Sequence, residues 1–225
     1  MELKILDRID FNSPSLGIYF LILAALVGYI SYSYKSYPRN ILLANFNTRL
    51  LNNQSQDESN LSRKASIWLT FYFILVVGLI LFFLLKKFHF NQFNLSDSAL
   101  LIFAASLSLV GYLLKTGFKI FIGFLFKLSP LNLSANFILG LKDKAFAIII
   151  FPFLILYGFS LPLEELAEYG IIGISGLYLI YRWIHGIIIG FKKGNLPIVY
   201  SILYICTLEI LPLILVLKVI SKLQS

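Results

Sequence analysis

The sequence predicts an all-α integral membrane protein, a polytopic bundle of about six transmembrane helices that forms a single domain over residues 1–225. Its composition is the first reason: 59% of the residues are hydrophobic, only 13% are charged, and the mean hydropathy is +0.85. A soluble domain has about 25% charged residues. The second reason is that the apolar residues form long continuous runs, and most basic residues lie between these runs.

The apolar runs define the expected spans. A helix needs about 20 apolar residues to cross the bilayer core and satisfies its backbone hydrogen bonds internally. The runs are continuous and do not alternate, which favours helices over barrel strands. The expected spans are residues 15–34, 65–85, 98–114, 144–159, 168–191 and 196–217, of which the fourth is short and contains Pro152.

Residues 115–143 do not fit a simple span. Phenylalanines alternate here with three lysines, Lys115, Lys119 and Lys127. This pattern predicts an amphipathic cytoplasmic extension of the third helix. A further span is the alternative, which the two lysines in its first turns disfavour. In the first loop, residues 41–51 have an apolar stripe at helical spacing, which predicts a short interfacial helix, and the polar residues 52–60 predict a flexible linker.

The distribution of basic residues predicts the orientation. The net charge is +8, and twelve basic residues lie in the first, third and fifth loops, against six in the termini and the other loops. Because basic loops stay in the cytoplasm during insertion, we expect both termini on the outer side of the membrane. The basic loops also predict a cytoplasmic face that binds anionic lipid headgroups or an acidic partner, but not nucleic acid.

A carboxylate in the last expected span is the main candidate for a functional site. An ionised Glu209 in hydrocarbon must be paired, protonated or in contact with water. At 1.5 Å per residue, Glu209 and Arg182 of the fifth span lie about 20 and 13 Å from the cytoplasmic ends of their helices. An arginine side chain can bridge that offset, so we expect an Arg182–Glu209 pair facing the bundle interior. The full candidate polar site is Glu209, Arg182, His185, Cys206, Tyr204 and Pro212.

Two interpretations of this pair remain open. Pro212 frees a helical carbonyl close to Glu209, and such a kink beside a buried acid suits an ion or ligand site. The pair can equally be structural and fix the register of two helices. The glycines of the fifth span, Gly170, Gly173, Gly176, Gly186 and Gly190, indicate tight helix packing, and Pro152 again fits either packing or a functional break.

The sequence lacks the usual signatures of enzymes. It has two histidines and one cysteine, and neither a phosphate-binding loop nor a Gly-x-Ser-x-Gly elbow is present. We therefore expect no catalytic residues, no metal site and no cofactor.

The end of the chain resembles a known family. Leu203, Tyr204, Cys206, Leu208, Glu209, Ile210 and Pro212 match a Leu-Tyr-x-Cys-x-Leu-Glu-Ile-x-Pro signature. This signature is similar to that of an uncharacterised bacterial family of integral membrane proteins, domain of unknown function 4271. Arg182, Pro152 and the stretch Tyr37-Pro38-Arg39 also resemble it. The resemblance implies an inner-membrane location and brings no established activity.

Three classes of function compete. Short loops and the absence of catalytic signatures favour an accessory or scaffold subunit of a cell-envelope complex, with membrane lipids and other envelope membrane proteins as partners. A small transporter or channel that uses the Glu/Arg pair is the alternative, supported by Glu209, Arg182, His185 and the two prolines inside spans. An intramembrane enzyme acting on lipid has the least support.

Overall fold

A computed structural model describes residues 14–34, 37–38, 41–42, 60–87, 96–125, 129–159 and 163–193. These residues form the helices α1 (Pro14–Ser33), α4 (Asn60–Lys87), α5 (Asp97–Leu125), α6 (Ser129–Phe159) and α7 (Glu164–Lys193), and the described part contains no strand. The prediction of an all-α fold is thereby confirmed. α1, residues 64–87 of α4 and residues 97–117 of α5 are long and apolar enough to cross a membrane.

The helix ends follow from local sequence. Pro14 begins α1 and Pro130 lies in the first turn of α6, positions where the missing N–H costs nothing. α7 begins with Glu164 and Glu165, and α4 ends with Lys86 and Lys87. Acidic residues at the start and basic residues at the end of a helix both interact favourably with its dipole.

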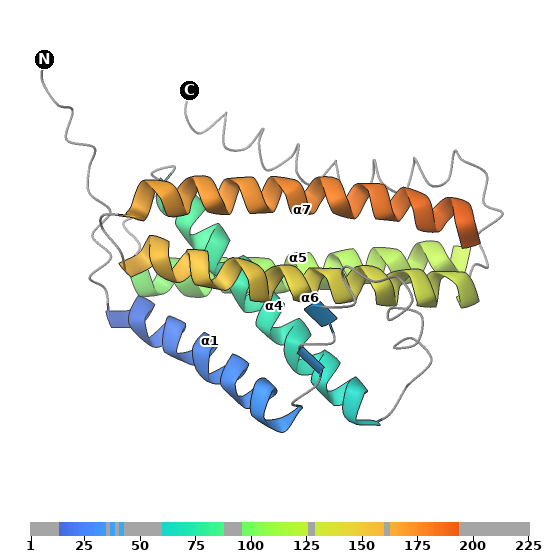
Figure 1. Cartoon of the computed structure of the whole chain (residues 1–225), viewed down its shortest axis with the longest axis horizontal. Coiled ribbons are helices and arrows are strands. Elements are labelled where there is room, and N and C mark those ends of the chain that lie inside the picture. Colours follow the sequence, from blue (N-terminus) through green and yellow to red (C-terminus); the bar gives the residue numbers. More distant parts are fainter. Residues whose placement is uncertain are drawn as a thin grey trace, which may run out of the picture.

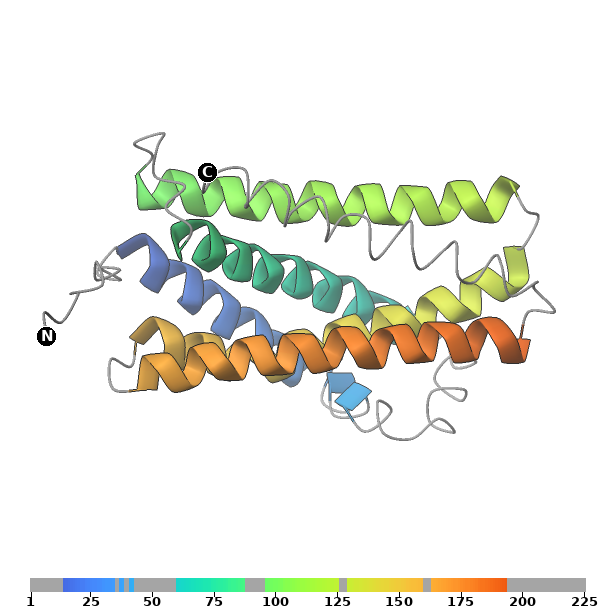
Figure 2. The same ribbon diagram turned by 90° about the horizontal axis from the view of Figure 1, so that it is seen from above.

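α4 is the central helix and packs against α1, α5 and α6. α7 packs mainly on α6, and these two helices lie antiparallel along most of their length (Figure 1). Seen from above, α4 lies between α5 on one side and the α6–α7 pair on the other (Figure 2). The core at this centre includes Leu69, Tyr72, Val76, Leu79 and Phe82 of α4, which are all fully buried.

One glycine lets the backbones of α4 and α5 approach closely. A Cβ atom on Gly78 of α4 would lie 3.0 Å from the Cα atom of Ala105 in α5. At the same crossing Ser108 donates a hydrogen bond of 2.9 Å to the carbonyl of Ile74. Small residues that let two backbones approach are the usual contact between membrane helices.

The helices of the middle of the chain differ from the expected spans. The third expected span, 98–114, continues as helix to Leu125, so residues 115–125 do extend it. The fourth begins at Ser129, fifteen residues before the expected position 144, and continues through Pro152 to Phe159. The prediction that residues 115–143 extend the third helix is therefore wrong for residues 129–143, which form the first half of α6. Whether these extensions lie in the cytoplasm stays a prediction.

Candidate functional site

The main polar site of the described helices lies between α6 and α7. Lys142, Asp143 and Lys144 of α6 and Arg182 of α7 are only 1%, 6%, 7% and 4% exposed. Together with Ser66 of α4 and Tyr178 and Tyr181 of α7, they form what we call the α6–α7 polar cluster. Charged side chains this deeply buried must be paired or hydrogen-bonded, because an isolated buried charge is costly.

Asp143 is the acceptor of the cluster. Its Oδ1 atom accepts hydrogen bonds from Tyr178 Oη and from Arg182 Nη1, and the latter contact is also an ion pair. Arg182 Nη1 also donates to Tyr178 Oη at 3.0 Å. Tyr178 and Arg182 are four residues apart and therefore share one face of α7. Phe146, one turn beyond Asp143, stacks on the Tyr178 ring at 4.1 Å and fixes its orientation.

Lys144 connects this pair of helices to α4. Its Nζ atom donates a hydrogen bond of 2.5 Å to Ser66 Oγ, near the start of the apolar part of α4. The cluster therefore joins three helices through side chains separated by 35 to 78 residues in sequence.

Lys142 has a different environment. Within the described residues its Nζ atom has no hydrogen-bond acceptor. It lies instead over the Tyr181 ring, 4.2 Å from the ring centre, in a cation–π contact. Lys142 precedes the expected fourth span and lies outside the three apolar helical segments. Burial lowers the pKa of its ammonium group from 10.5 to about 8.

The cluster is rich in positive charge. Its described residues supply three basic side chains, Lys142, Lys144 and Arg182, and one carboxylate, Asp143. Such a site favours an anion or the loss of a proton from a lysine. The described residues contain no group of His, Cys, Asp and Glu side chains that could hold a metal ion.

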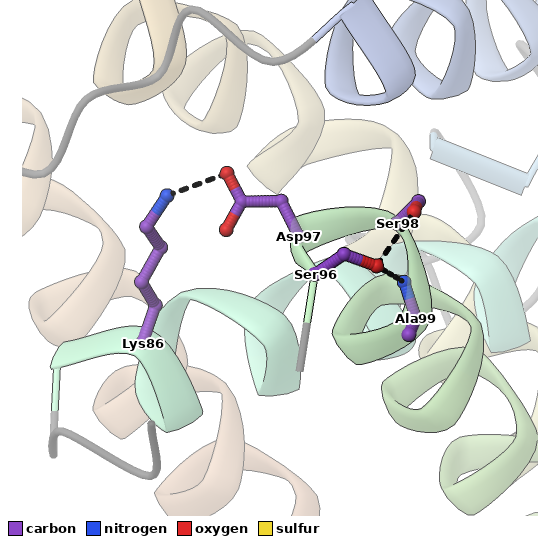
Figure 3. A network of polar contacts seen from close by, with 5 residues as sticks. All are labelled: Lys86, Ser96, Asp97, Ser98 and Ala99. Carbon is purple, nitrogen blue, oxygen red and sulfur yellow. Dashed lines mark hydrogen bonds and ion pairs between the residues drawn. The ribbon is translucent and has the colours of Figure 1, made fainter. Parts of the chain in front are cut away.

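A second set of charged residues lies at the other end of the helices. Lys86 of α4 pairs with Asp97 of α5 at 3.1 Å, and Lys87 pairs with Glu168 of α7. Figure 3 shows Lys86 reaching across to Asp97, with Ser96 beside it accepting a hydrogen bond from the Ala99 N–H as the cap of α5. Glu168 and Arg182 are about 21 Å apart along α7, so charged side chains cluster at two well-separated levels.

The structure places only part of the predicted polar site. Arg182 is buried, and the described structure shows it in contact with Asp143 and Tyr178. Glu209, Cys206, Tyr204 and Pro212 lie outside the described residues, so the Arg182–Glu209 pair stays a prediction. His185 belongs to α7, but its side chain is likewise outside the description.

The described residues test the predicted packing of the α7 glycines at one position. A Cβ atom on Gly170 would lie 2.9 Å from Phe153 Cδ1 of α6, so this glycine packs closely against α6. Gly173 and Gly176 have no neighbouring atom of the described residues within 4 Å of such a Cβ, so their tight packing stays a prediction. The surroundings of Gly186 and Gly190 lie outside the described part.

Sequence reasoning missed Asp143 and Tyr178. Asp143 is flanked by two lysines, a pattern typical of a loop, and was assigned to the segment before the fourth span. The available signal was the apolar sequence on both sides, Phe137–Leu141 and Ala145–Phe151, which allows one continuous helix. A carboxylate within such a helix needs a basic partner on a neighbouring helix, and Arg182 is the first basic residue after Lys144.

The fold and the site define a class: a helical-bundle protein in which three of the described helices are long and apolar enough to span a membrane, with a buried charged cluster between two further helices, α6 and α7. Residues 16–220 match the family described as "Domain of unknown function (DUF4271)", and the chain belongs to this family. No curated protein and no solved structure matches the chain.

Proposed function

We propose that the protein is a non-enzymatic accessory or scaffold subunit of a cell-envelope complex in the bacterial inner membrane. The observation that carries this proposal is the two-sided character of α7. One face, with Arg182 and Tyr178, is joined to α6 through Asp143. The other face is apolar and exposed.

The exposed face of α7 has the features of a helix-packing surface. Tyr169, Ile172, Leu177, Ile180 and Ile184 are each at least half exposed, and they recur at helical spacing around Gly173 and Gly176. Membrane helices associate through small residues that let a second backbone approach, and large apolar residues beside them fill the contact. The α6–α7 polar cluster supports a role of this face in packing, because the cluster fixes the rotation of α7 about its axis and so determines which face points outward.

Site-specific photo-crosslinking tests the proposal. A photoreactive residue at Leu177, next to the open glycines, should cross-link to one defined membrane protein in intact cells. The same residue at Ile102 of α5, which is 68% exposed and has no glycine within two helical turns, serves as the control. Cross-links from Leu177 only to lipid, or only to residues 196–217 of the same chain, would contradict the proposal.

A small transporter or channel is the second candidate, favoured by the α6–α7 polar cluster. Ionisable residues within membrane helices are often part of an ion or proton pathway. The double variant Asp143→Asn/Arg182→Met separates the two functions, because it leaves neither charge of the pair alone. A double variant that folds but loses the cellular phenotype supports transport, and one that retains the phenotype argues for a structural pair.

A further inference from the structure

A pocket opens between α4, α6 and α7 at the end of the bundle away from the polar cluster. Its volume is about 160 Å³. Seven of its lining residues are apolar or aromatic: Ile80, Phe83, Leu84, Leu154, Tyr157, Ile171 and Ile172. The other two are Lys87 and Glu168, the ion pair between the end of α4 and the beginning of α7. The pocket is therefore amphipathic, with an apolar interior and both charges at one end.

The charges lie at the level where lipid headgroups are found. Lys87 is the last residue of α4, and residues 64–87 form one of the segments able to cross a membrane. From Lys87 the pocket follows α4 to Ile80, which is about 10 Å toward the middle of the helix. A lysine at the end of an apolar helix lies in the headgroup region, so the apolar interior lies at acyl-chain depth.

We propose that this pocket binds a phospholipid whose headgroup contains a primary ammonium group. The first carbons of one acyl chain fill the apolar interior, the phosphate accepts hydrogen bonds from Lys87, and the ammonium donates to Glu168. The Lys87–Glu168 contact does not block such a ligand. Its side chains are 47% and 31% exposed, and an exposed ion pair contributes little stability, so it opens at low cost.

The pair of charges selects the headgroup. A phosphoethanolamine group has one anion and one cation that can donate three hydrogen bonds, which complements Lys87 and Glu168 together. A choline headgroup has a quaternary ammonium and cannot donate a hydrogen bond to the carboxylate. An anionic headgroup such as phosphatidylglycerol matches Lys87 but has no cation to neutralise Glu168.

The neighbouring ion pair provides a matched control. Lys86 is adjacent to Lys87 in sequence and pairs with Asp97 in the same way, yet neither Lys86 nor Asp97 lines the pocket. Replacing Lys86 changes the net charge at this end of the bundle as much as replacing Lys87 does. A general effect of charge on lipid binding would therefore be the same for both replacements, whereas a specific site in the pocket makes only the Lys87 replacement matter.

Native mass spectrometry tests the proposal on the full chain. Delipidated protein is incubated with equal amounts of phosphatidylethanolamine, phosphatidylcholine and phosphatidylglycerol with identical acyl chains. We expect phosphatidylethanolamine to be retained about tenfold more than the other two, the size of a charge-assisted hydrogen bond. Glu168→Gln should abolish the preference over phosphatidylcholine, Lys87→Gln should weaken retention of all three lipids, and Lys86→Gln should leave the pattern unchanged.

A pocket-filling variant separates a specific site from the general lipid layer. Ile172→Trp puts a large ring into the pocket and should remove the tightest-bound lipid; if it does not fold, Leu84→Phe replaces it. Equal retention of the three lipids by the wild type overturns the proposal. So does an equal effect of Lys86→Gln and Lys87→Gln, or unchanged binding in the filled variant. The outcome is independent of the proposed scaffold role.

Discussion

Lys142 and Asp143 are neighbours in α6 and are both buried, but they have opposite hydrogen-bonding environments. The Asp143 carboxylate accepts from Tyr178 and Arg182 of α7, whereas Lys142 Nζ has no acceptor among the described residues and lies over Tyr181. We therefore expect that neutralising Asp143 lowers the stability of the protein, whereas neutralising Lys142 leaves it unchanged or raises it.

Neutralising Asp143 should strongly destabilise the protein. Asp143→Asn removes the carboxylate that pairs with the buried Arg182 cation in the described structure, and breaking a buried pair costs about 3 to 5 kcal/mol. Arg182→Met should be similarly harmful, and the double variant should recover much of the loss. The fraction of monodisperse protein after heating measures each effect in detergent. Additive losses in the double variant would show that the two residues do not act as a pair.

Neutralising Lys142 should leave the protein as stable or make it more stable. Lys142→Met replaces a buried ammonium that lacks an acceptor with an apolar side chain of similar length. Below pH 8 both the folded and unfolded states bind the lysine proton, so the folded state bears the full cost of burial. Between pH 8 and 10.5 only the unfolded state keeps it, so wild-type stability should rise.

The advantage of Lys142→Met should consequently shrink as the pH rises from 8 toward 10. Unfolding temperatures of wild type and variant at pH 7, 8, 9 and 10 measure this. A constant difference across the series would mean that Lys142 does not lose its proton in this range.

Two tyrosine hydroxyls should differ in importance. Tyr178→Phe removes a hydroxyl that bonds Asp143 and Arg182, which costs about 1 to 3 kcal/mol. Tyr72→Phe removes a buried hydroxyl that has no hydrogen-bond partner among the described residues, so stability should stay the same or rise. Thermal unfolding of both variants under identical conditions tests the difference. Equal losses would argue against Tyr178 as a hydrogen-bond donor to Asp143.

The α4–α5 crossing should not tolerate a larger residue at Gly78. A Cβ atom there meets the backbone of Ala105, which cannot move like a side chain, and overpacking costs about 1 to 3 kcal/mol. Gly173→Ala is the control, because its Cβ has open space in the described structure. If Gly78→Ala is as stable as Gly173→Ala, the prediction is wrong, and α4 and α5 can move apart at the crossing without a loss of stability.

The predicted orientation has its own test. With Cys206 replaced, single cysteines at Gln54 and Gln224 should be labelled by an impermeant reagent from opposite sides. The basic first loop predicts that Gln54 reacts only from the cytoplasm, and the count of six spans predicts that Gln224 reacts from the periplasm. Labelling of both positions from one side would show that the number of spans between them is even.

The sequence predicts the helices better than their contacts. Long apolar runs determine α1, α4 and the first part of α5, since their length and composition depend only on local sequence. α6 begins earlier than predicted, because the charged residues at 142–144 favour a span that starts only after them. Lys142, Asp143 and Lys144 are tolerated inside the helix by partners on α4 and α7, and such tertiary partners leave no local pattern.

The candidate site shows the same limit. Arg182 stands out in sequence because it interrupts an apolar run, but its position gives no information about which carboxylate it contacts. The contact with Asp143 depends on the antiparallel pairing of α6 and α7 and on the rotation of each helix. Neither quantity follows from composition, and a depth estimate along one helix cannot replace them.

The Lys86–Asp97 pair joins the end of α4 to the beginning of α5, and Ser96 caps α5, so contacts between residues on either side of segment 88–95 hold the two helix ends. The two helices also meet at Gly78 and Ser108. Lengthening a connection between ends already fixed costs little, about 0.6 kcal/mol for each doubling. The segment is therefore a permissive place for an inserted peptide tag, a means to detect or immobilise the protein without touching α7.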